Sequence, residues 1–488
     1  MYKIPPNKYK WLLIPVENYV REFYGKLLFS AVAAERGWGI IMAYKGDIRF
    51  NPPDMNGVVI DLNMTSDERA TRYMSHGWRV SAWDEEGLIY NNREVYAHRR
   101  LNDAALNKFD YVFLWGENQC KDILSYNNAI IEKLVLTGNP RFDLLRPDLR
   151  EFYSRDASAL KSKYGKYILI NTTFGDVNHY FGKDNPFKVL TGKSMTKEQE
   201  LDQIAREKYK TQLLHAFIDM LPAFSAHFPE HKIIIRPHPS ENFDTWKLAA
   251  KDLPNVMMIH EGDSIPWMLS AEVVIHNSCT TGVQAYLLGR PVIAYRPVHS
   301  DLYDMYLPNA LSYQAQDNDQ LVTLVSELTA NRGSIDQEAE NEKRLVAQEY
   351  ITGLDGPWAA DRIMDELETL DINPEIFDNG YFATNDNSSR PAGFMTKLKD
   401  KLKHILMGKN SNQPFRDWLK KPGMENRPVS SQAQGKDWEA YRRQRFPTLS
   451  YNNVLSDFQR LQEVSGRFSN VRVGLTENNI LYILPLEK

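Results

Sequence analysis

The sequence has little cysteine, no long apolar run and no strong net charge. Cys120 and Cys279 are its only cysteines, and they lie far apart without metal-site spacing, so disulfides are not expected and a reducing compartment is favoured. Residues 1–30 lack the basic, apolar and small segments of a signal peptide, and no apolar run reaches the roughly 18 residues that span a membrane. A net charge of −4 gives no support for a nucleic-acid partner. These absences predict a soluble, cytoplasmic protein.

Several common cofactor motifs are also missing. The sequence contains no Gly-x-Gly-x-x-Gly, P-loop or His-Glu-x-x-His pattern, which removes the usual dehydrogenase, kinase and zinc-protease interpretations. Asp317-Asn318-Asp319 has the form of a metal-binding pair, but it directly precedes the helical run 320–328, where Asp319 is more simply a helix N-cap. The sequence therefore predicts no metal site and no bound cofactor.

Strand candidates alternate with helices through most of the chain. This alternation predicts an α/β protein with two doubly wound, Rossmann-like domains, a ligand cleft between them and a small C-terminal extension. The expected ranges are 1–150 for the first domain, 151–375 for the second, 376–428 for a linker with a basic amphipathic helix, and 429–488 for a small C-terminal unit.

Polar clusters follow the expected strand ends, where parallel sheets carry their working residues. In the first domain these clusters contain Glu17, Asn18, Asp84, Glu85, Glu86 and Arg141. The acids before Gly87 can be catalytic groups that face the cleft, or they can form a solvated turn. Asp176 follows a strand of the second domain and should face these acids, although a plain turn position also explains it. Asp176, Glu85 and Glu86 are thus the candidate nucleophile and base.

The most informative stretch is the turn from His276 to Gly282, between a β-branched strand and a helix. Five polar residues lie where the helix must begin: His276, Asn277, Ser278, Thr280 and Thr281. A helix N-terminus offers free N–H groups and a positive dipole end, so the turn suits a phosphate, whereas capping alone needs only one such residue.

A second polar strand end is Arg236-Pro237-His238-Pro239. Its prolines fix the backbone and hold His238 at the carboxyl edge of the strand. We therefore expect a nucleotide donor with its phosphate on Ser278–Gly282, a polar contact from His238, and Gln284 within reach of a ribose hydroxyl.

Residues 393–409 place apolar side chains on one helical face and lysines on much of the rest. Such a helix can lie on an anionic membrane surface, or it can pack on its own protein with a solvated lysine face. The first alternative would put the protein peripherally on the inner face of the cytoplasmic membrane.

The Arg236–Pro239 stretch and the segment from His276 to Val292 together resemble the donor half of GT-B glycosyltransferases of bacterial surface-polysaccharide synthesis. The sequence is most similar to the surface carbohydrate biosynthesis proteins and to the retaining β-Kdo transferases of capsule and O-antigen (lipopolysaccharide) assembly. The likeness extends to Glu85-Glu86-Gly87, to residues 138–143 and to the 173–176 loop. It covers about residues 10–370, and the C-terminal unit resembles the tail of the surface carbohydrate proteins.

This resemblance implies a CMP-activated donor, most simply Kdo or a similar 2-ulosonic acid, and a lipid-linked or oligosaccharide acceptor. Asp176 would form a glycosyl-enzyme, and Glu85 or Glu86 would then deprotonate the acceptor, with retention of configuration. No metal is implied, because the helix dipole and side chains stabilise the leaving phosphate. The resemblance places His238, Ser278, Thr280, Thr281 and Gly282 around the donor phosphate. The other candidate donor residues are Arg236, Pro239, His276, Asn277 and Gln284, and the candidate acceptor-side residues are Glu17, Asn18 and Arg141.

Two features depart from the family pattern. Related transferases usually carry Glu where this chain has Gln284, and the loop that contains Asp176 has an unusual composition. Two other functions stay open on the sequence. One is the transfer of CDP-linked polyol phosphates, as in teichoic-acid-like polymers. The other is a non-catalytic glycan-binding or scaffold role on the same fold.

Overall fold

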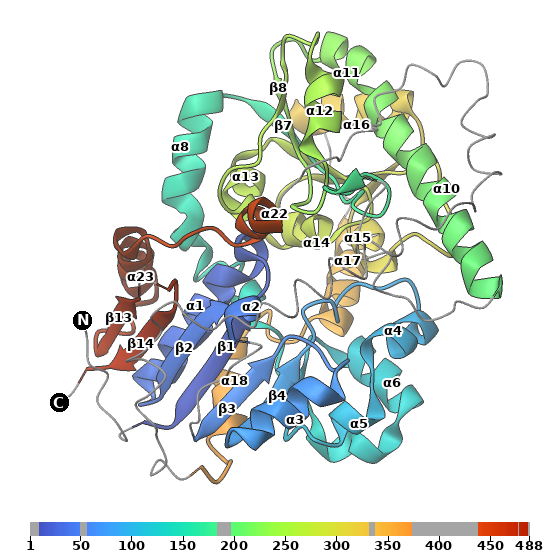
Figure 1. Ribbon diagram of the computed structural model, residues 1–488. Coiled ribbons are helices and arrows are strands. Elements are labelled where there is room, and N and C mark those ends of the chain that lie inside the picture. The colour runs from blue at the N-terminus through green and yellow to red at the C-terminus, as the bar shows by residue number, and fades with distance from the viewer. Residues whose placement is uncertain are drawn as a thin grey trace.

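The computed structural model describes residues 9–48, 56–182, 197–330, 337–372, 438–476 and 478–486. Two sheets with flanking helices lie at opposite ends of the molecule, the first at the bottom of Figure 1 and the second at the top. The predicted linker (376–428) and its basic helix (393–409) fall outside these ranges.

The first sheet has the strand order β13-β14-β2-β1-β3-β4-β5-β6. Strands β1 to β6 pair in parallel, whereas β14 is antiparallel to both β2 and β13. The strands are β1 Trp11–Val16, β2 Gly39–Tyr44, β3 Gly57–Asp61, β4 Trp78–Trp83, β5 Val112–Leu114, β6 Leu134–Leu136, β13 Val471–Leu475 and β14 Leu481–Pro485.

The second sheet is parallel throughout, in the order β12-β11-β10-β7-β8-β9. Its strands are β7 Tyr167–Asn171, β8 Lys232–Arg236, β9 Val256–Met258, β10 Val273–His276, β11 Val292–Tyr295 and β12 Tyr313–Ala315. The central strands are isoleucine- and valine-rich runs buried on both faces, as parallel strands covered by helices must be. Two Rossmann-like domains are thus confirmed.

Helices connect the strands in both domains. In the first half they are α1 Tyr19–Glu35, α2 Lys45–Ile48, α3 Asp67–Ser75, α4 Arg93–Arg100, α5 Asp103–Leu106, α6 Glu117–Tyr126, α7 Pro140–Asp143 and α8 Ser154–Tyr164, with 3-10 turns η1 Asn128–Lys133 and η2 Arg150–Tyr153. In the second half they are α10 Lys197–Asp219, α11 Leu221–His227, α12 Phe243–Ala250, α13 Ser264–Ser270, α14 Thr280–Leu287, α15 Tyr306–Ala310, α16 Asn318–Thr329, α17 Gln337–Tyr350 and α18 Ala359–Leu367. Helix α10 ends at Asp219, and Pro222 lies in the first turn of α11.

Strand alternation divides the core into layers. In β1, Leu12 and Ile14 pack in the cluster that contains α1, whereas Trp11 and Leu13 point to the opposite face, toward α3. The α1 cluster also contains Leu169 of β7, so one apolar core joins the inner sides of both domains. The two sheets are therefore held together by a shared core rather than by a flexible connection.

The chain returns to the first domain after α16, which lies on the second sheet, although the range predicted for the second domain ran to residue 375. Helix α18 packs on α1 and α7, and α17 packs on α6. Both carboxylate oxygens of Asp143 accept N–H groups at the start of α18, from Ala359 at 2.8 Å and Ala360 at 3.0 Å. Asp143 therefore caps a helix that lies more than two hundred residues further along the chain.

Replacing Asp143 with alanine is expected to lower the free energy of unfolding by about 2 kcal/mol, because it leaves buried N–H groups at the α18 N-terminus unpaired. Urea denaturation at neutral pH measures the change. Asp365→Ala is the control, since this carboxylate of α18 is largely exposed and, among the described residues, pairs with Arg36 alone; its loss should cost less than about 1 kcal/mol. Equal effects of the two substitutions would contradict the capping role.

The C-terminal segment, predicted as a small unit over 429–488, packs on the first domain. Its elements are α22 Trp438–Arg445, α23 Tyr451–Ser465, β13 and β14, and the pairing of β14 with β2 extends the first sheet. In Figure 1, α22 lies between the two domains. The Gln444 amide donates to the carbonyl of Pro239, and Arg445 pairs with Glu17 at 2.7 Å, so α22 contacts both domains.

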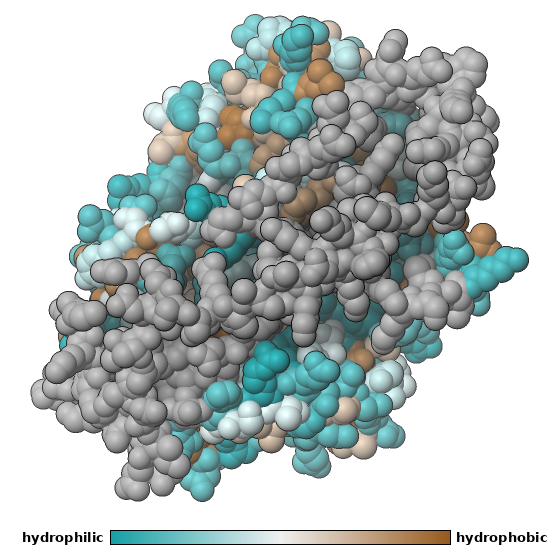
Figure 2. Space-filling view, viewed as in Figure 1, coloured by the Kyte–Doolittle hydropathy of each residue, from teal (hydrophilic) through white to brown (hydrophobic). Residues whose placement is uncertain are grey.

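The described surface on the face shown in Figure 2 is mainly hydrophilic, with apolar residues in small, separate areas. Within the described ranges, no helix is long and apolar enough to cross a membrane.

Candidate active site

A cavity of about 690 Å³ lies between the two domains. Its walls are formed by loops that follow β1 and β4 in the first domain and β7, β8 and β10 in the second. The strands β10, β7 and β8 are neighbours in the second sheet, so their carboxyl ends deliver three loops to the same place. Most of the residues predicted from the sequence line this cavity: Glu17, Asn18, Glu86, Arg141, Asp176, Arg236, His238, Pro239, Ser278, Thr280, Thr281 and Gln284.

Helix α14 begins at the wall of the cavity with Thr280, after the N-cap residue Cys279. Within the described residues, the N–H of Thr280 has no hydrogen-bond acceptor. Ser278 adopts a left-handed conformation with φ of 59°, which is strained for a residue with a side chain. Its hydroxyl donates to Asn309 Oδ1 at 2.9 Å. The turn thus directs the start of α14 into the cavity. The N–H of Thr280, which lacks an acceptor among the described residues, and the positive end of the helix dipole both lie there.

Three residues of this turn were expected at the ligand and instead lie beneath the cavity. His276 is fully buried, and its ring contacts Ser312 Oγ at 2.9 Å and the N–H of Cys279 at 3.4 Å. Asn277 Oδ1 accepts the N–H of Thr173 at 2.9 Å. Gly282 lies against the imidazole, since a Cβ there would come within 2.5 Å of His276 Nε2. These residues shape the turn but do not line the cavity, which corrects their placement.

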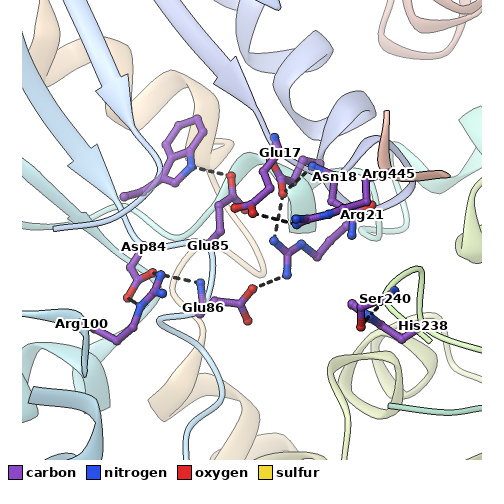
Figure 3. A network of polar contacts seen from close by, with 12 residues as sticks. Glu17, Asn18, Arg21, Asp84, Glu85, Glu86, Arg100, His238, Ser240 and Arg445 are labelled. Atoms are coloured by element: carbon purple, nitrogen blue, oxygen red, sulfur yellow. Dashed lines mark hydrogen bonds and ion pairs between the residues drawn. The ribbon is translucent and has the colours of Figure 1, made fainter. Parts of the chain in front are cut away.

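His238 presents a neutral ring to the cavity. Its Nδ1 accepts the N–H of Ser240 at 3.2 Å, which leaves the ring hydrogen on Nε2. Burial, with help from the charge of Arg21, lowers the pKa of His238 to about 4. At neutral pH the residue is therefore an uncharged hydrogen-bond donor; Figure 3 shows it across the cleft from Arg21 and Glu86.

Arg236 is held by the protein itself. Its guanidinium donates to the carbonyls of Glu261 at 2.7 Å and Gly262 at 3.0 Å and lies over the ring of Trp267. Burial lowers the pKa of Arg236 to about 10. Arg236 lines the cavity, but two of its guanidinium nitrogens already donate to these backbone carbonyls.

A buried carboxylate that the sequence did not reveal fixes the loops around His238. Glu241 accepts hydrogen bonds from the N–H of His238 at 3.0 Å, the N–H of Phe174 at 3.1 Å and the Thr172 hydroxyl at 2.8 Å. Its other oxygen accepts Trp246 Nε1 at 2.9 Å. Burial raises its pKa even so. Glu241 thus joins the loops after β7 and β8; the only sequence signal is its position just after the His-Pro stretch.

Glu85 and Glu86 have different environments although they are adjacent (Figure 3). Glu85 is 6% exposed, accepts Trp83 Nε1 at 2.8 Å and pairs with Lys26 at 2.8 Å. It does not line the cavity, so its predicted position in the cleft is wrong. Lys26 also pairs with Glu22 at 2.7 Å. Glu85 is one member of a buried ionic network that anchors α1 to the first sheet.

Glu86 lines the cavity with 49% of its side chain exposed. Its carboxylate pairs with Arg21, and its N–H donates to Asp84 Oδ1 at 3.1 Å. Burial acts to raise the pKa of Glu86, but the charges of Arg21 and Arg100 outweigh it and lower the pKa below its usual value. Glu86 is therefore an accessible anion at neutral pH.

The remaining residues of the first-domain wall are charged. Glu17 pairs with Lys45 at 2.6 Å and with Arg445 of α22 at 2.7 Å. Burial would raise the pKa of Glu17, yet these cations hold it well below its usual range. Arg141 is 8% exposed, and burial lowers its pKa to about 10. Its Nε has no hydrogen-bond partner among the described residues.

Asp176 lies exposed at the edge of the cavity, and its carboxylate makes no hydrogen bond or ion pair within the described residues. Gln284 is buried at the cavity wall, one turn into α14. In the part of the chain that the structure describes, no group of three or more His, Cys, Asp or Glu side chains is arranged to hold a metal ion.

Two Rossmann-like domains, with strand carboxyl ends around a central cavity, define a GT-B-like α/β protein. No family model and no curated protein matches the sequence. Solved structures that resemble it include a UDP-N-acetylglucosamine 2-epimerase, with 14% identity over 79% of this chain and 100% of that chain and a TM-score of 0.47. The UDP-GlcNAc 2-epimerase from Neisseria meningitidis has 12% identity over 74% and 99% of the two chains, with a TM-score of 0.45. The wall teichoic acid polymerase TagF has 11% identity over 74% and 89%, with a TM-score of 0.46.

Proposed function

We propose that this protein is a metal-independent glycosyltransferase that transfers a sugar from a nucleotide donor to a glycan acceptor in surface-polysaccharide synthesis. One observation carries the proposal: the open N-terminus of α14 and the neutral donor His238 share one interdomain cavity with two accessible carboxylates, Glu86 and Asp176. The first pair suits a phosphate, and the second suits the chemistry at a sugar carbon.

The donor phosphate would lie at the start of α14. The N–H of Thr280 and the Nε2 hydrogen of His238 would donate to its oxygens, and the helix dipole would stabilise the charge that develops when the phosphate leaves. Gln284, one turn further along α14, would contact the ribose. We propose a CMP-linked donor, carrying Kdo or a similar 2-ulosonic acid.

Sugar transfer would proceed by double displacement. Asp176 would attack the anomeric carbon, and the bond from that carbon to the phosphate oxygen would break, with its electron pair leaving on the phosphate. Glu86 would then accept the proton of an acceptor hydroxyl, whose oxygen displaces the Asp176 carboxylate from the same carbon. Two inversions give net retention. Glu85 has no part in this proposal, because it is buried against Lys26.

Thr280→Pro tests whether the backbone N–H of residue 280 binds the donor phosphate. Proline at the first position of a helix keeps the helical backbone but removes the N–H, and the extended conformation of Cys279 suits a residue before proline. We expect CMP affinity to fall about tenfold, as befits the loss of one hydrogen bond to a charged group. Thr280→Ala, which keeps the N–H, is the matched control and should lose much less.

Isothermal titration with CMP, CDP and UDP measures these affinities. Tight CDP binding without a CMP response would replace the CMP-sugar donor by a CDP-linked polyol phosphate. No response to any of the three nucleotides would refute the transferase proposal and favour a glycan-binding or scaffold role.

A further inference from the structure

Three cations that the proposed chemistry leaves unused line the cavity beside the start of α14. Arg206 and Lys210 are one turn apart on α10, so they occupy the same side of that helix, and Arg99 comes from α4 of the first domain. Lys210 is only 7% exposed, and Arg206 Nε is buried. Within the described residues, none of the three side chains makes a hydrogen bond or ion pair. The ammonium of Lys210 lies over the ring of Tyr209, 5.9 Å from its centroid, and pairs with no carboxylate of the described residues. A cation that is largely removed from water and lacks an anionic partner favours the binding of an anion.

Nearby carboxylates offset these charges only in part. Asp176 is close enough to influence both Arg99 and Lys210, but it contacts neither. Asp304, which also faces Lys210, is already paired with Arg296. Asp202, which also acts on Arg99, accepts the hydroxyl of Tyr303 at 2.9 Å and keeps its negative charge. Three cations therefore stand against two carboxylates without a cationic partner in the described part of the chain, Asp176 and Asp202. The group therefore keeps a net positive charge inside the cavity.

The two guanidiniums also repel each other across the domain boundary. Burial lowers the pKa of Arg99, and the charge of Arg206 lowers it further. Burial likewise lowers the pKa of Lys210. Like charges from two domains are stable at such a boundary when an anion lies between them.

We propose that Arg99, Arg206 and Lys210 bind a second anionic group of the substrate, a phosphate or a carboxylate, that bridges the two domains. The inference rests on the proposed function, which places the first phosphate at α14. Lys210 lies close to Cys279, the residue before α14, and Arg206, one turn earlier on α10, lies close to Arg99. The second anion would thus lie between the α14 phosphate and the first domain. With the proposed CMP-linked donor, which carries one phosphate, it belongs to an acidic acceptor; with a CDP- or UDP-linked donor in its place, it would be the second phosphate of that donor.

Binding of inorganic phosphate to the full chain at constant ionic strength tests the site. We expect Arg206→Gln and Arg99→Gln each to weaken phosphate binding by about tenfold, because each removes a charge-assisted contact. The matched control is Lys208→Gln, which removes an exposed charge of the same helix outside the cavity and should leave the affinity unchanged. We also expect the melting temperature of Arg206→Gln to equal or exceed that of the wild type, because a repulsion is removed.

Nucleotide titrations separate the two sources of the anion. If the site holds a second donor phosphate, CDP or UDP should displace inorganic phosphate, and Arg206→Gln should weaken the diphosphates more than CMP. If it holds an acceptor group, phosphate should still bind to the CMP-saturated protein, and Arg206→Gln should leave nucleotide affinities unchanged.

Equal phosphate affinity in Arg206→Gln, Arg99→Gln and Lys208→Gln would overturn the inference. Arginine-dependent phosphate binding without any nucleotide binding would instead keep the anion site and refute the transferase proposal. The two failures are therefore distinguishable.

Discussion

Asp176→Asn is expected to lower kcat for sugar transfer about a thousandfold or more, while CMP binds with nearly unchanged affinity. The proposed nucleophile is a carboxylate oxygen, and a carboxamide cannot form the glycosyl-enzyme. The substitution should not disturb folding, because the Asp176 carboxylate is exposed at the cavity edge and makes no hydrogen bond or ion pair within the described residues. The loss should therefore appear in kcat rather than in stability.

Steady-state transfer from CMP-Kdo to a glycan acceptor measures the rate, and intact-mass analysis without acceptor looks for one added sugar residue on the protein. The adduct should form on the wild type and be absent from Asp176→Asn. Asp301→Asn is the control, since this exposed carboxylate lies outside the cavity. Full activity of Asp176→Asn would exclude double displacement through this residue, whereas an adduct that persists in the variant would assign the nucleophile elsewhere.

The parallel sheets and the loops at their strand ends could be predicted because their signals are local. The isoleucine- and valine-rich runs of β7, β8 and β10 are visible in the sequence, and a polar turn after such a run must lie at the carboxyl edge of the sheet. Thr280, His238 and Asp176 were found in this way, and the structure places all three on one cavity.

Side-chain direction within a polar turn could not be predicted. Glu85 and Glu86 are equivalent in the sequence, and the difference between them arises from Lys26 and Arg21 on α1, about sixty residues earlier. His276 was assigned to the ligand for the same reason, although it belongs to a buried contact with Ser312. Such choices depend on tertiary contacts that no local pattern encodes.

Long-range additions to the site were missed as well. Arg445 of α22 reaches Glu17 from within the segment 429–488, for which the sequence predicted only a small C-terminal unit. Arg206 and Lys210 did carry a signal, because their spacing of four residues places two cations on one helical side. That signal became meaningful only when α10 was found beside the start of α14, with Arg99 opposite.

Glu86→Gln is expected to lower kcat by about 10²- to 10⁴-fold, the usual contribution of a general base, with little change in the melting temperature. Its carboxylate is half exposed and pairs with Arg21, which has a second carboxylate partner in Glu22 at 2.9 Å. Since the charges of Arg21 and Arg100 lower the pKa of Glu86, the base stays ionised through the neutral and mildly acidic range. The kcat/KM of the wild type should therefore stay level from about pH 7.5 down to about pH 5.5.

Glu85→Ala should show the opposite pattern. The substitution is expected to lower the free energy of unfolding by about 3 kcal/mol. The buried ammonium of Lys26 keeps Glu22 but loses Glu85 as a partner, and Trp83 loses its hydrogen-bond acceptor. Any loss of activity should then follow the fraction of unfolded protein and recover on cooling. Urea denaturation and steady-state kinetics on both variants separate the two roles. A catalytic loss in Glu85→Ala at full folding, with normal turnover in Glu86→Gln, would assign the base to the buried residue and contradict the role that solvent access gives to Glu86.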